Sequence, residues 1–342
     1  MKKYRVAVIP GDGIGKEVVP EGRRVLDAAA RRFGFELEWQ HFDWSCEVYA
    51  RTGRMMPEDG LAQLRQFEAI YLGAVGFPGV PDHVSLWGLL IPIRREFHQY
   101  VNLRPVRLLR GVRSPLAGRG PGDIDMLIVR ENNEGEYSEI GGRLYRDTPH
   151  ELAVQQAVFT RRGCDRVIRY AFELASKRPR RHVTSATKSN GIIHSMPYWD
   201  ERFAAVSHEY PGIKTAQFHI DILTAHFVQH PDWFDVVVGS NLFGDILSDL
   251  GPAIAGSIGL APGGNINPEK EYPSMFEPVH GSAPDIAGQS KANPIAAILS
   301  AAMMLDFLGE ADAAARVRKA CADPSALGGT TQQIGDAVAE RV

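Results

Sequence analysis

Short apolar runs alternate with longer segments of helical periodicity along most of the chain. Residues 5–10 form a compact apolar run that Pro10 and Gly11 bring to an end, so we expect a buried strand there. Residues 17–33 then place apolar side chains three and four positions apart, which predicts an amphipathic helix. Because strands and helices alternate in this way, the pattern predicts an α/β protein.

Further elements are expected wherever apolar residues cluster. Short runs predict core strands at 69–75, 125–129, 182–184 and 236–238. Residues 292–307 are almost all apolar, which indicates a helix that is buried on most sides. The Arg-, Gly- and Pro-rich residues 110–122 indicate an exposed loop, and residues 132–145 indicate an irregular arm or hairpin.

Composition and charge narrow the class of protein. The chain has 342 residues, of which 44% are hydrophobic, enough for a large core with one or two lobes. Its 38 basic and 41 acidic residues give a net charge of -3, which argues against a nucleic-acid-binding or membrane-surface protein. An acidic substrate would therefore have to be held by local arginines.

The three cysteines are far apart in the sequence, at positions 46, 164 and 321. We expect neither a disulfide framework nor a zinc site, and a reducing, cytoplasmic setting fits best. The first apolar run ends at Gly11, too early for a signal peptide, and no apolar stretch reaches the roughly 20 residues of a membrane span.

The motif at 241–249, Asn-Leu-Phe-Gly-Asp-Ile-Leu-Ser-Asp, should open a helix after a strand. Asp245 and Asp249 would then lie one turn apart on the same helix face, where two carboxylates repel each other. A Mg²⁺ or Mn²⁺ ion bound between them would turn that repulsion into attraction. A solvated helix start, which also favours acidic residues, is the alternative.

Arg94, Arg104 and Arg130 suggest a site for a carboxylate substrate. Arg130 ends the apolar run at 125–129, where an arginine is not a natural core residue. A guanidinium group can bind a carboxylate through two parallel hydrogen bonds, which fixes orientation as well as charge. Ordinary surface ion pairs are the alternative, above all for Arg94.

Two further side chains could transfer protons. Lys188 follows a predicted strand and could act as a base if its pKa were lowered, although a solvated loop lysine shows the same pattern. Tyr137 could donate a proton or could simply pack against its neighbours.

Two glycine-containing segments could bind a cofactor. In residues 276–288, Gly281 would allow close approach of the backbone, and Asp285 could bind ribose hydroxyls and so favour NAD over NADP. A Pro/Gly-rich surface loop is the alternative. Residues 11–15, Gly-Asp-Gly-Ile-Gly, lack the Rossmann glycine spacing, so we interpret them as a tight turn.

Together these motifs resemble the isocitrate and 3-isopropylmalate dehydrogenase family over essentially the whole chain. The motifs are residues 11–15, Asn-Leu-Arg-Pro at 102–105, Arg-Glu-Asn at 130–132, residues 241–249, and Gly-Ser-Ala-Pro-Asp at 281–285. The resemblance implies a two-lobed α/β fold with mixed sheets that is not a Rossmann fold. It also implies a cofactor-binding lobe, residues 1–100 and 256–342, and a lobe of residues 101–255 that carries the dimer interface and an arm.

The resemblance also implies roles for individual residues. Arg94, Arg104 and Arg130 would hold the malate-like part of the substrate, and Tyr137 and Lys188 would be the acid–base pair. Asp221, Asp245 and Asp249 would bind Mn²⁺ or Mg²⁺. Members of the family are homodimers with shared active sites, so Lys188 and Asp221 would serve the neighbouring subunit. The residues expected near NAD are Glu277, His280, Gly281, Ser282, Asp285 and Asn293.

Residues 85–94 match the segment that sets substrate specificity in the family. Trp87 and Leu90 would contact the substrate, and the segment is most similar to those of tartrate dehydrogenases and decarboxylating D-malate dehydrogenases. A bulky indole would fill the space of a substrate side group, leaving room for a small 2-hydroxy dicarboxylic acid. Pro92 should kink or shorten the helix expected there.

Two alternative functions differ in their expected properties. The first is 3-isopropylmalate dehydrogenase, which would prefer a branched substrate. The second is a non-enzymatic NAD-binding or RNA-binding protein, against which the full set of Arg94, Lys188 and Asp245 and the lack of a basic patch both argue.

Overall fold

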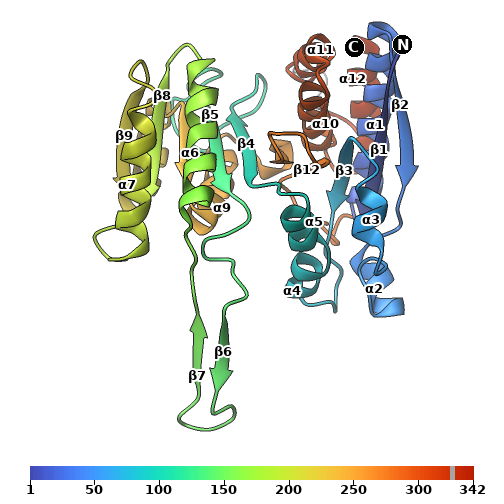
Figure 1. The fold of residues 1–342 in the computed structure, drawn as a ribbon. Helices are drawn as coiled ribbons and strands as arrows, with labels where there is room; N and C mark the ends of the chain where they lie inside the picture. Colours follow the sequence, from blue (N-terminus) through green and yellow to red (C-terminus); the bar gives the residue numbers. More distant parts are fainter. Residues whose placement is uncertain (324–327) are drawn as a thin grey trace.

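A computed structural model describes residues 1–323 and 328–342 (Figure 1). The strands of its main sheet are β1 (Lys2–Gly11), β2 (Phe35–His41), β3 (Ala69–Ala74), β4 (Val101–Arg107), β5 (Asp125–Glu131), β8 (His182–Thr187), β9 (Lys214–His219), β10 (Val236–Gly239), β11 (Pro262–Ile266) and β12 (Ser274–Pro278). A separate hairpin consists of β6 (Gly141–Leu144) and β7 (Leu152–Gln155).

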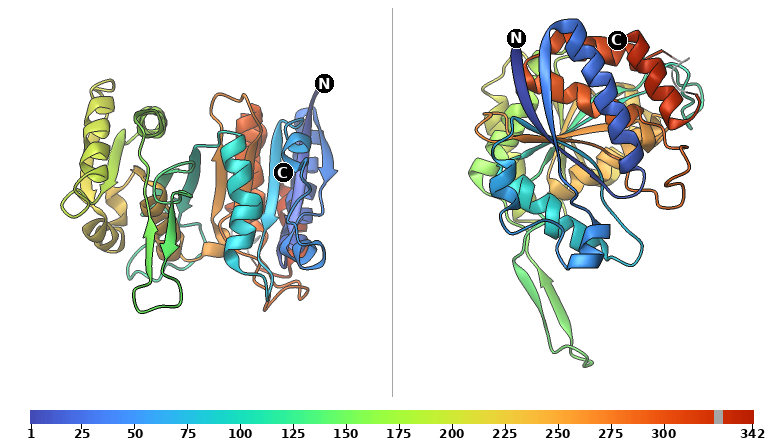
Figure 2. Two further views of the ribbon diagram at one scale, coloured as in Figure 1. Left: turned by 60° about the horizontal axis from the view of Figure 1, so that its bottom comes forward. Right: turned by 90° about the vertical axis from the view of Figure 1, so that its right-hand side faces the viewer.

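Helices lie on both faces of the main sheet (Figure 2). The α-helices are α1 (Gly15–Phe33), α2 (Cys46–Thr52), α3 (Gly60–Leu64), α4 (Asp82–Ser85), α5 (Ile91–Glu96), α6 (Arg161–Ser176), α7 (Ser195–Ser207), α8 (Ile220–Gln229), α9 (Asn241–Ile254), α10 (Ile295–Leu308), α11 (Ala311–Cys321) and α12 (Thr331–Arg341). A π-helical segment, η1 (Leu86–Leu90), joins α4 to α5, and two 3-10 turns are η2 (Pro231–Trp233) and η3 (Ile258–Leu260).

The main sheet is mixed and runs in the order β2-β1-β3-β12-β11-β4-β5-β10-β8-β9. Its two ends are parallel, but β11 is antiparallel to β12 and to β4, and β4 is antiparallel to β5. The expected α/β class with a mixed sheet is therefore confirmed. Strands from 1–100 and 256–342 form one end of the sheet and strands from 101–255 the other, so β11 and β4 meet where the predicted lobes would join. The division into lobes stays a prediction.

The pattern of buried residues explains why the predicted elements form. In β1, Val6 and Val8 belong to the apolar core on one side of the sheet, and Ala7 and Ile9 belong to the core on the other. This alternation is what a strand covered on both faces requires. The strands predicted at 5–10, 69–75, 125–129, 182–184 and 236–238 and the helices at 17–33 and 292–307 are all confirmed.

The arm predicted within residues 132–145 is confirmed in part. Strand β6 lies in that range, but the hairpin continues to Gln155 and projects away from the body of the protein (Figure 1). All residues of β6 and β7 are exposed, including the apolar Leu144, Leu152 and Val154. Apolar side chains on an isolated hairpin bury nothing in a single chain, so this arm gains stability only if it contacts something else.

Pro92 distorts its helix, as predicted, but does not end it. The chain stays helical from α4 through η1 to α5, with Pro92 in the first turn of α5. The amide of Ile91 donates to the carbonyl of Leu86, five residues earlier, which widens the helix into the π segment immediately before the proline. Among the described residues, no helix combines the length and apolar character needed to cross a membrane.

The packing of α1 on β3 generates a stability prediction. A Cβ atom on Gly22 would lie 1.9 Å from the Oη of Tyr71, whose buried side chain donates a hydrogen bond to the carbonyl of Ala297. Helix propensity alone favours Gly22→Ala by about 1 kcal/mol, but the steric overlap of the new Cβ atom with Tyr71 should cost more than that. We expect Gly22→Ala to lower the free energy of unfolding by about 1–3 kcal/mol, measured by urea denaturation.

Two controls accompany this measurement. Gly120→Ala lies in a loop where a Cβ atom would have no neighbour closer than Asp123 Oδ2 at 4.0 Å, so it should change stability by less than about 0.5 kcal/mol. In a Tyr71→Phe background, which lacks the overlapping oxygen, the cost of Gly22→Ala should shrink. An equal cost in both backgrounds would mean that the tyrosine is not the obstacle.

Candidate active site

The central strands carry polar side chains on one face of the sheet. Asn102 of β4 lies directly opposite Arg130 of β5 and also opposite Asn265 of β11. Arg104 follows two residues after Asn102, so it points to the same face. All four side chains are buried, which makes this face the unusual part of an otherwise apolar sheet.

Glu277 of β12 binds two of the predicted substrate arginines. Its Oε1 atom lies 3.0 Å from Arg94 Nη2 and 3.9 Å from Arg104 Nη2, and all three side chains are at most 9% exposed. Although burial opposes ionisation of Glu277, the two arginines and Asn265 hold its pKa below the usual value. Burial lowers the pKa of Arg104 to about 10, so this guanidinium remains charged at neutral pH.

Three asparagine amides connect this ion cluster to the strands around it. Asn265 donates to Glu277 at 2.8 Å and accepts hydrogen bonds from Asn102 and Asn132 at 2.8 and 3.0 Å. The oxygen of Asn102 accepts from Arg104 Nε at 2.8 Å. Arg94 and Arg104 are therefore each held in one orientation, and each guanidinium keeps N–H donors that a ligand could use. Among the described residues, Arg94 Nε is a buried donor without a partner.

Arg130, Tyr137 and Asp245 form a second cluster. Arg130 forms an ion pair with Asp245 and donates to the side-chain oxygen of Asn241 from Nε at 3.0 Å and from Nη2 at 2.7 Å. Tyr137 donates its hydroxyl hydrogen to Asp245 Oδ2 at 2.7 Å. A Cβ atom on Gly244 would lie 2.5 Å from Arg130 Cβ, so glycine allows α9 to approach β5 this closely.

Asp249 lies one turn after Asp245 on α9, as predicted. Partial burial and then the charge of Asp245 raise the pKa of Asp249, while Arg104 and Arg130 act in the opposite direction. Burial and the hydrogen bond to Asp245 raise the pKa of Tyr137 to about 12, so it carries its proton at neutral pH. The two carboxylates supply hard oxygen ligands that suit Mg²⁺ or Mn²⁺, but within one chain the described residues hold no group of three acidic, histidine or cysteine metal ligands.

Lys188 and Asp221 lie together but apart from these clusters. Thr187 pairs with His219 in the β8–β9 register, so the residues that follow both strands are neighbours. Lys188 Nζ is 3.0 Å from Asp221 Oδ1, and the side chains are 29% and 66% exposed. This exposure leaves both groups available to something outside the chain.

A cavity of about 160 Å³ brings together six of the predicted site residues. They are Leu90, Arg94, Arg104, Glu277, His280 and Gly281. Three were predicted from the arginine and specificity segments and three from the cofactor segment. Substrate and cofactor contacts predicted from distant parts of the sequence therefore share one cavity.

The rest of the predicted cofactor segment has mixed surroundings. Ser282 is buried, and its carbonyl accepts a hydrogen bond from the amide of Ile14 at 2.8 Å, which ties the segment to the turn after β1. Asp285 is exposed. The side chain of Asn293 accepts from the amide of Ile295 at the start of α10 at 3.0 Å.

Trp87 lies in the π segment and is connected to the tyrosine of the site. The guanidinium of Arg95 lies 5.0 Å from the centre of the Trp87 ring and donates to the carbonyl of Tyr137 at 2.9 Å. This cation–π contact links the specificity segment to the beginning of the arm.

Several residues that hold the site in place were not predicted. Asn265 was missed because Gly-Gly-Asn-Ile-Asn-Pro at 263–268 looks like a turn and not a strand. Glu136 was also missed, although it accepts hydrogen bonds from Ser240 Oγ at 2.7 Å and from the amide of Leu242 at 3.0 Å. It thus joins the arm next to Tyr137 to the N-terminus of α9, where a carboxylate is favoured. Only the density of glutamates at 131–136 hinted at this role.

Comparison with known proteins agrees with this arrangement. A sequence model of the isocitrate/isopropylmalate dehydrogenase family matches residues 5–340. The decarboxylating D-malate dehydrogenase of Escherichia coli K12 is 64% identical, covering 91% of this chain and 87% of that protein. The tartrate dehydrogenase/decarboxylase of Pseudomonas putida is 56% identical, covering 98% and 97%. The crystal structure of an isocitrate dehydrogenase from Methylococcus capsulatus has a TM-score of 0.87 at 32% identity and covers 99% of both chains.

Glu131 generates a prediction about pH. It is buried beside Arg130 and accepts hydrogen bonds from the amides of Asn133 and Glu134, with Arg166 Nη2 at 3.7 Å. Burial dominates and raises its pKa from 4.5 to about 7. Because the folded state then binds a proton that the unfolded state releases, this group's contribution to stability is lost as pH rises from 4.5 to about 7.

We expect Glu131→Gln to remove this loss, so its stability relative to the wild type should increase by up to ~3 kcal/mol between pH 4.5 and 8. Urea unfolding at several pH values measures the difference. Glu209→Gln, an exposed carboxylate paired with Arg169, is the matched control and should show no such trend. A Glu131→Gln curve parallel to the wild type would show that Glu131 is ionised across this range.

Proposed function

The chain belongs to the isocitrate/isopropylmalate dehydrogenase family, and we propose that it oxidises and decarboxylates D-malate or tartrate with NAD and a divalent metal ion. The observation that carries this proposal is the convergence of buried arginines and cofactor-segment residues on one face of the sheet. Arg94, Arg104, His280 and Gly281 line the same cavity, and Arg130 lies beside Arg104 in the charge network. Such a site suits a small molecule with two carboxylates next to a nucleotide.

The size of the site favours a compact acid over 3-isopropylmalate. Leu90 lines the cavity of about 160 Å³, and Trp87 lies in the same π segment, in contact with Arg95. A branched substituent would have to displace these bulky side chains. The high identity to D-malate and tartrate enzymes over nearly the whole chain supports the same choice.

NAD is favoured over NADP by charge. Asp285 is exposed at the end of the cofactor segment, where it could accept hydrogen bonds from ribose hydroxyls. A carboxylate there would repel the 2′-phosphate of NADP. We propose that Glu277, His280, Gly281, Ser282, Asp285 and Asn293 contact the cofactor, with Glu277 also fixing the arginines.

Asp245 and Asp249 fit a divalent metal ion because they present two carboxylates one helical turn apart beside the arginine cluster. We propose that Asp221 of a second chain completes the ligand set. A divalent cation held there would favour ionisation of the substrate hydroxyl, and NAD would supply the hydride acceptor. A cytoplasmic location remains a prediction.

The side chains would then divide the reaction as follows. Arg94, Arg104 and Arg130 orient the two carboxylates. Lys188 first gives up its ion pair with Asp221 and contacts the substrate instead. It then removes the proton of the C2 hydroxyl while the hydrogen on C2 leaves as hydride. The C3 carboxylate leaves as CO₂, its bonding electrons forming the enolate. Tyr137 then returns a proton to C3, which its high pKa permits because the enolate carbon is more basic.

A homodimer with shared active sites accounts for the groups that lie apart in one chain. Lys188 and Asp221 are paired on the surface, away from Asp245. Apolar side chains are exposed on the same helices, including Ile222 and Ile246, and on the projecting hairpin. Two copies of the chain could bury these surfaces while bringing each Lys188 to the partner's tyrosine.

A substrate panel tests the proposed reaction. We expect kcat/KM for D-malate or tartrate to exceed that for 3-isopropylmalate by about tenfold or more, because the branched group must displace bulky side chains. The kcat/KM measured with NAD should exceed that measured with NADP by a similar factor. EDTA should abolish turnover, and Mn²⁺ or Mg²⁺ should restore it. A preference for 3-isopropylmalate, or full activity in EDTA, would contradict the proposal.

Mixing two inactive variants tests the shared site. Lys188→Ala and Asp245→Asn should each lose at least about 10²-fold in kcat. If each site takes Lys188 from one chain and Asp245 from the other, a heterodimer of the two variants has one intact site. Denaturing and refolding an equal mixture should therefore restore about a quarter of wild-type activity.

The control is a mixture of Tyr137→Phe with Asp245→Asn, two variants of groups that lie within one chain. This mixture should recover nothing, because each active site of the heterodimer contains a variant residue. Recovery in the control, or no recovery in the first mixture, would contradict the proposed sharing.

A further inference from the structure

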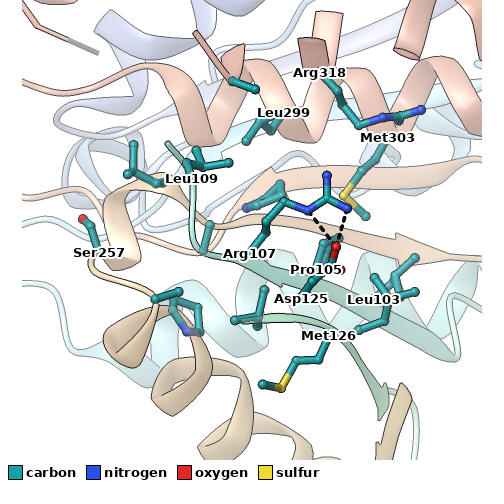
Figure 3. A pocket seen from close by; sticks show the side chains of 18 of the residues that line it. Leu103, Pro105, Arg107, Leu109, Asp125, Met126, Ser257, Leu299, Met303 and Arg318 are labelled. Carbon is teal, nitrogen blue, oxygen red and sulfur yellow. Dashed lines mark hydrogen bonds and ion pairs between the residues drawn. The ribbon is translucent and has the colours of Figure 1, made fainter. Parts of the chain in front are cut away.

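A second, larger cavity lies at β4 and β5 and is lined mainly by side chains that point away from the candidate active site. Its volume is about 310 Å³, and β4, β5, β11, α9 and α10 all contribute to its walls (Figure 3). Most of its lining is apolar, with Leu103, Pro105, Leu127, Leu299 and Met303 among the residues that form it. Small-molecule sites are typically cavities of about 300–1,000 Å³ with mostly apolar walls, so this cavity lies at the lower end of that range.

The pleat of the strands separates the two sites. In β4, Leu103, Pro105 and Arg107 line the larger cavity, while Asn102 and Arg104 belong to the polar network on the other face. Most of the larger cavity is therefore separated from the substrate arginines by β4, although Val106 and Met126 also reach it from the arginine side. A ligand in this cavity would not compete with substrate or NAD.

Charged side chains at the cavity retain hydrogen-bond donors that a ligand could use. Arg107 donates to Asp125 through Nε and Nη2, and Arg318 donates to Asp306 through Nη1 and Nη2. A guanidinium has five N–H groups, so both arginines keep unused donors. Arg178 also lines the cavity but is occupied by Asp125 and by the buried Asp235.

We propose that this cavity binds a small amphipathic anion, with an apolar body among the leucine and methionine side chains and one carboxylate or sulfonate at Arg107 and Arg318. Apolar walls alone would accept any hydrophobic molecule. Three arginines and two aspartates line the cavity, so its charge is net positive, which favours an anion through charge-assisted hydrogen bonds and disfavours a cation.

Calorimetry with octanoate as the probe tests this site, first in the free enzyme and then in the enzyme saturated with NAD and Mn²⁺. We expect one octanoate per chain with a Kd of roughly 0.1–1 mM, typical of a ligand of this size. 1-Octanol, which has the same chain without the charge, should bind at least about fivefold more weakly. Equal binding of the two, displacement of octanoate by NAD or D-malate, or no binding at millimolar concentration would overturn the proposal.

Variants locate the binding. Met303→Trp fills the cavity and should weaken octanoate binding at least about tenfold, and Arg318→Gln should weaken it about threefold or more. Arg169→Gln is the matched control, because Arg169 also donates twice to one carboxylate and its side chain is likewise 38% exposed.

Arg107→Gln is a second rim variant that leaves the apolar walls intact if Met303→Trp fails to fold. Thermal unfolding and kcat verify that each variant keeps its native structure. Wild-type affinity in both Arg107→Gln and Arg318→Gln would overturn the assignment, as would an equal loss in the Arg169→Gln control.

Discussion

The buried carboxylate of Glu277 is the constraint on which the arrangement of the candidate site depends. Without a counter-charge between them, Arg94 and Arg104 would repel each other, and burying their charges away from water would cost a large amount of free energy. Glu277 supplies that charge, and the asparagine network fixes its direction. The guanidiniums are consequently held in place before any ligand arrives, so binding a dicarboxylate need not order them first.

Much of the fold followed from apolar patterning because the core strands are short, continuous and covered on both faces. The strands of 69–75 and 236–238 are of this kind, and nothing but burial is needed to predict them. β11 and β12 escaped prediction for the opposite reason. The glycine, asparagine and proline residues of β11 resemble a turn, and β12 begins a Pro/Gly-rich segment. Both strands nevertheless lie in the middle of the sheet, where Asn265 and Glu277 are hydrogen-bonded to each other.

The same distinction separates the site residues that sequence predicted from those it missed. Arg130 was predicted because it is a charged residue at the end of an apolar run, and Asp245 because a second carboxylate follows it one helical turn later. The structure brings these two residues together. Glu136 lies in a polar stretch that predicts no particular role, and Asn132 was identified only as part of a family motif, without a role of its own. Their function lies in hydrogen bonds to distant segments, which no local spacing encodes. The roles proposed for Lys188 and Asp221 came from family resemblance, since within one chain they contact only each other among these groups.

A strand that is covered on both faces can place side chains in two different environments, and β4 is an example. Its even-numbered residues, such as Asn102 and Arg104, join a charged network, while Leu103 and Pro105 line an apolar cavity. Because neighbouring residues share one backbone, any movement of β4 that repacks one face must also move the other. The antiparallel junction of β4 with β11 is therefore the place where an occupied cavity and an occupied active site would influence each other most directly.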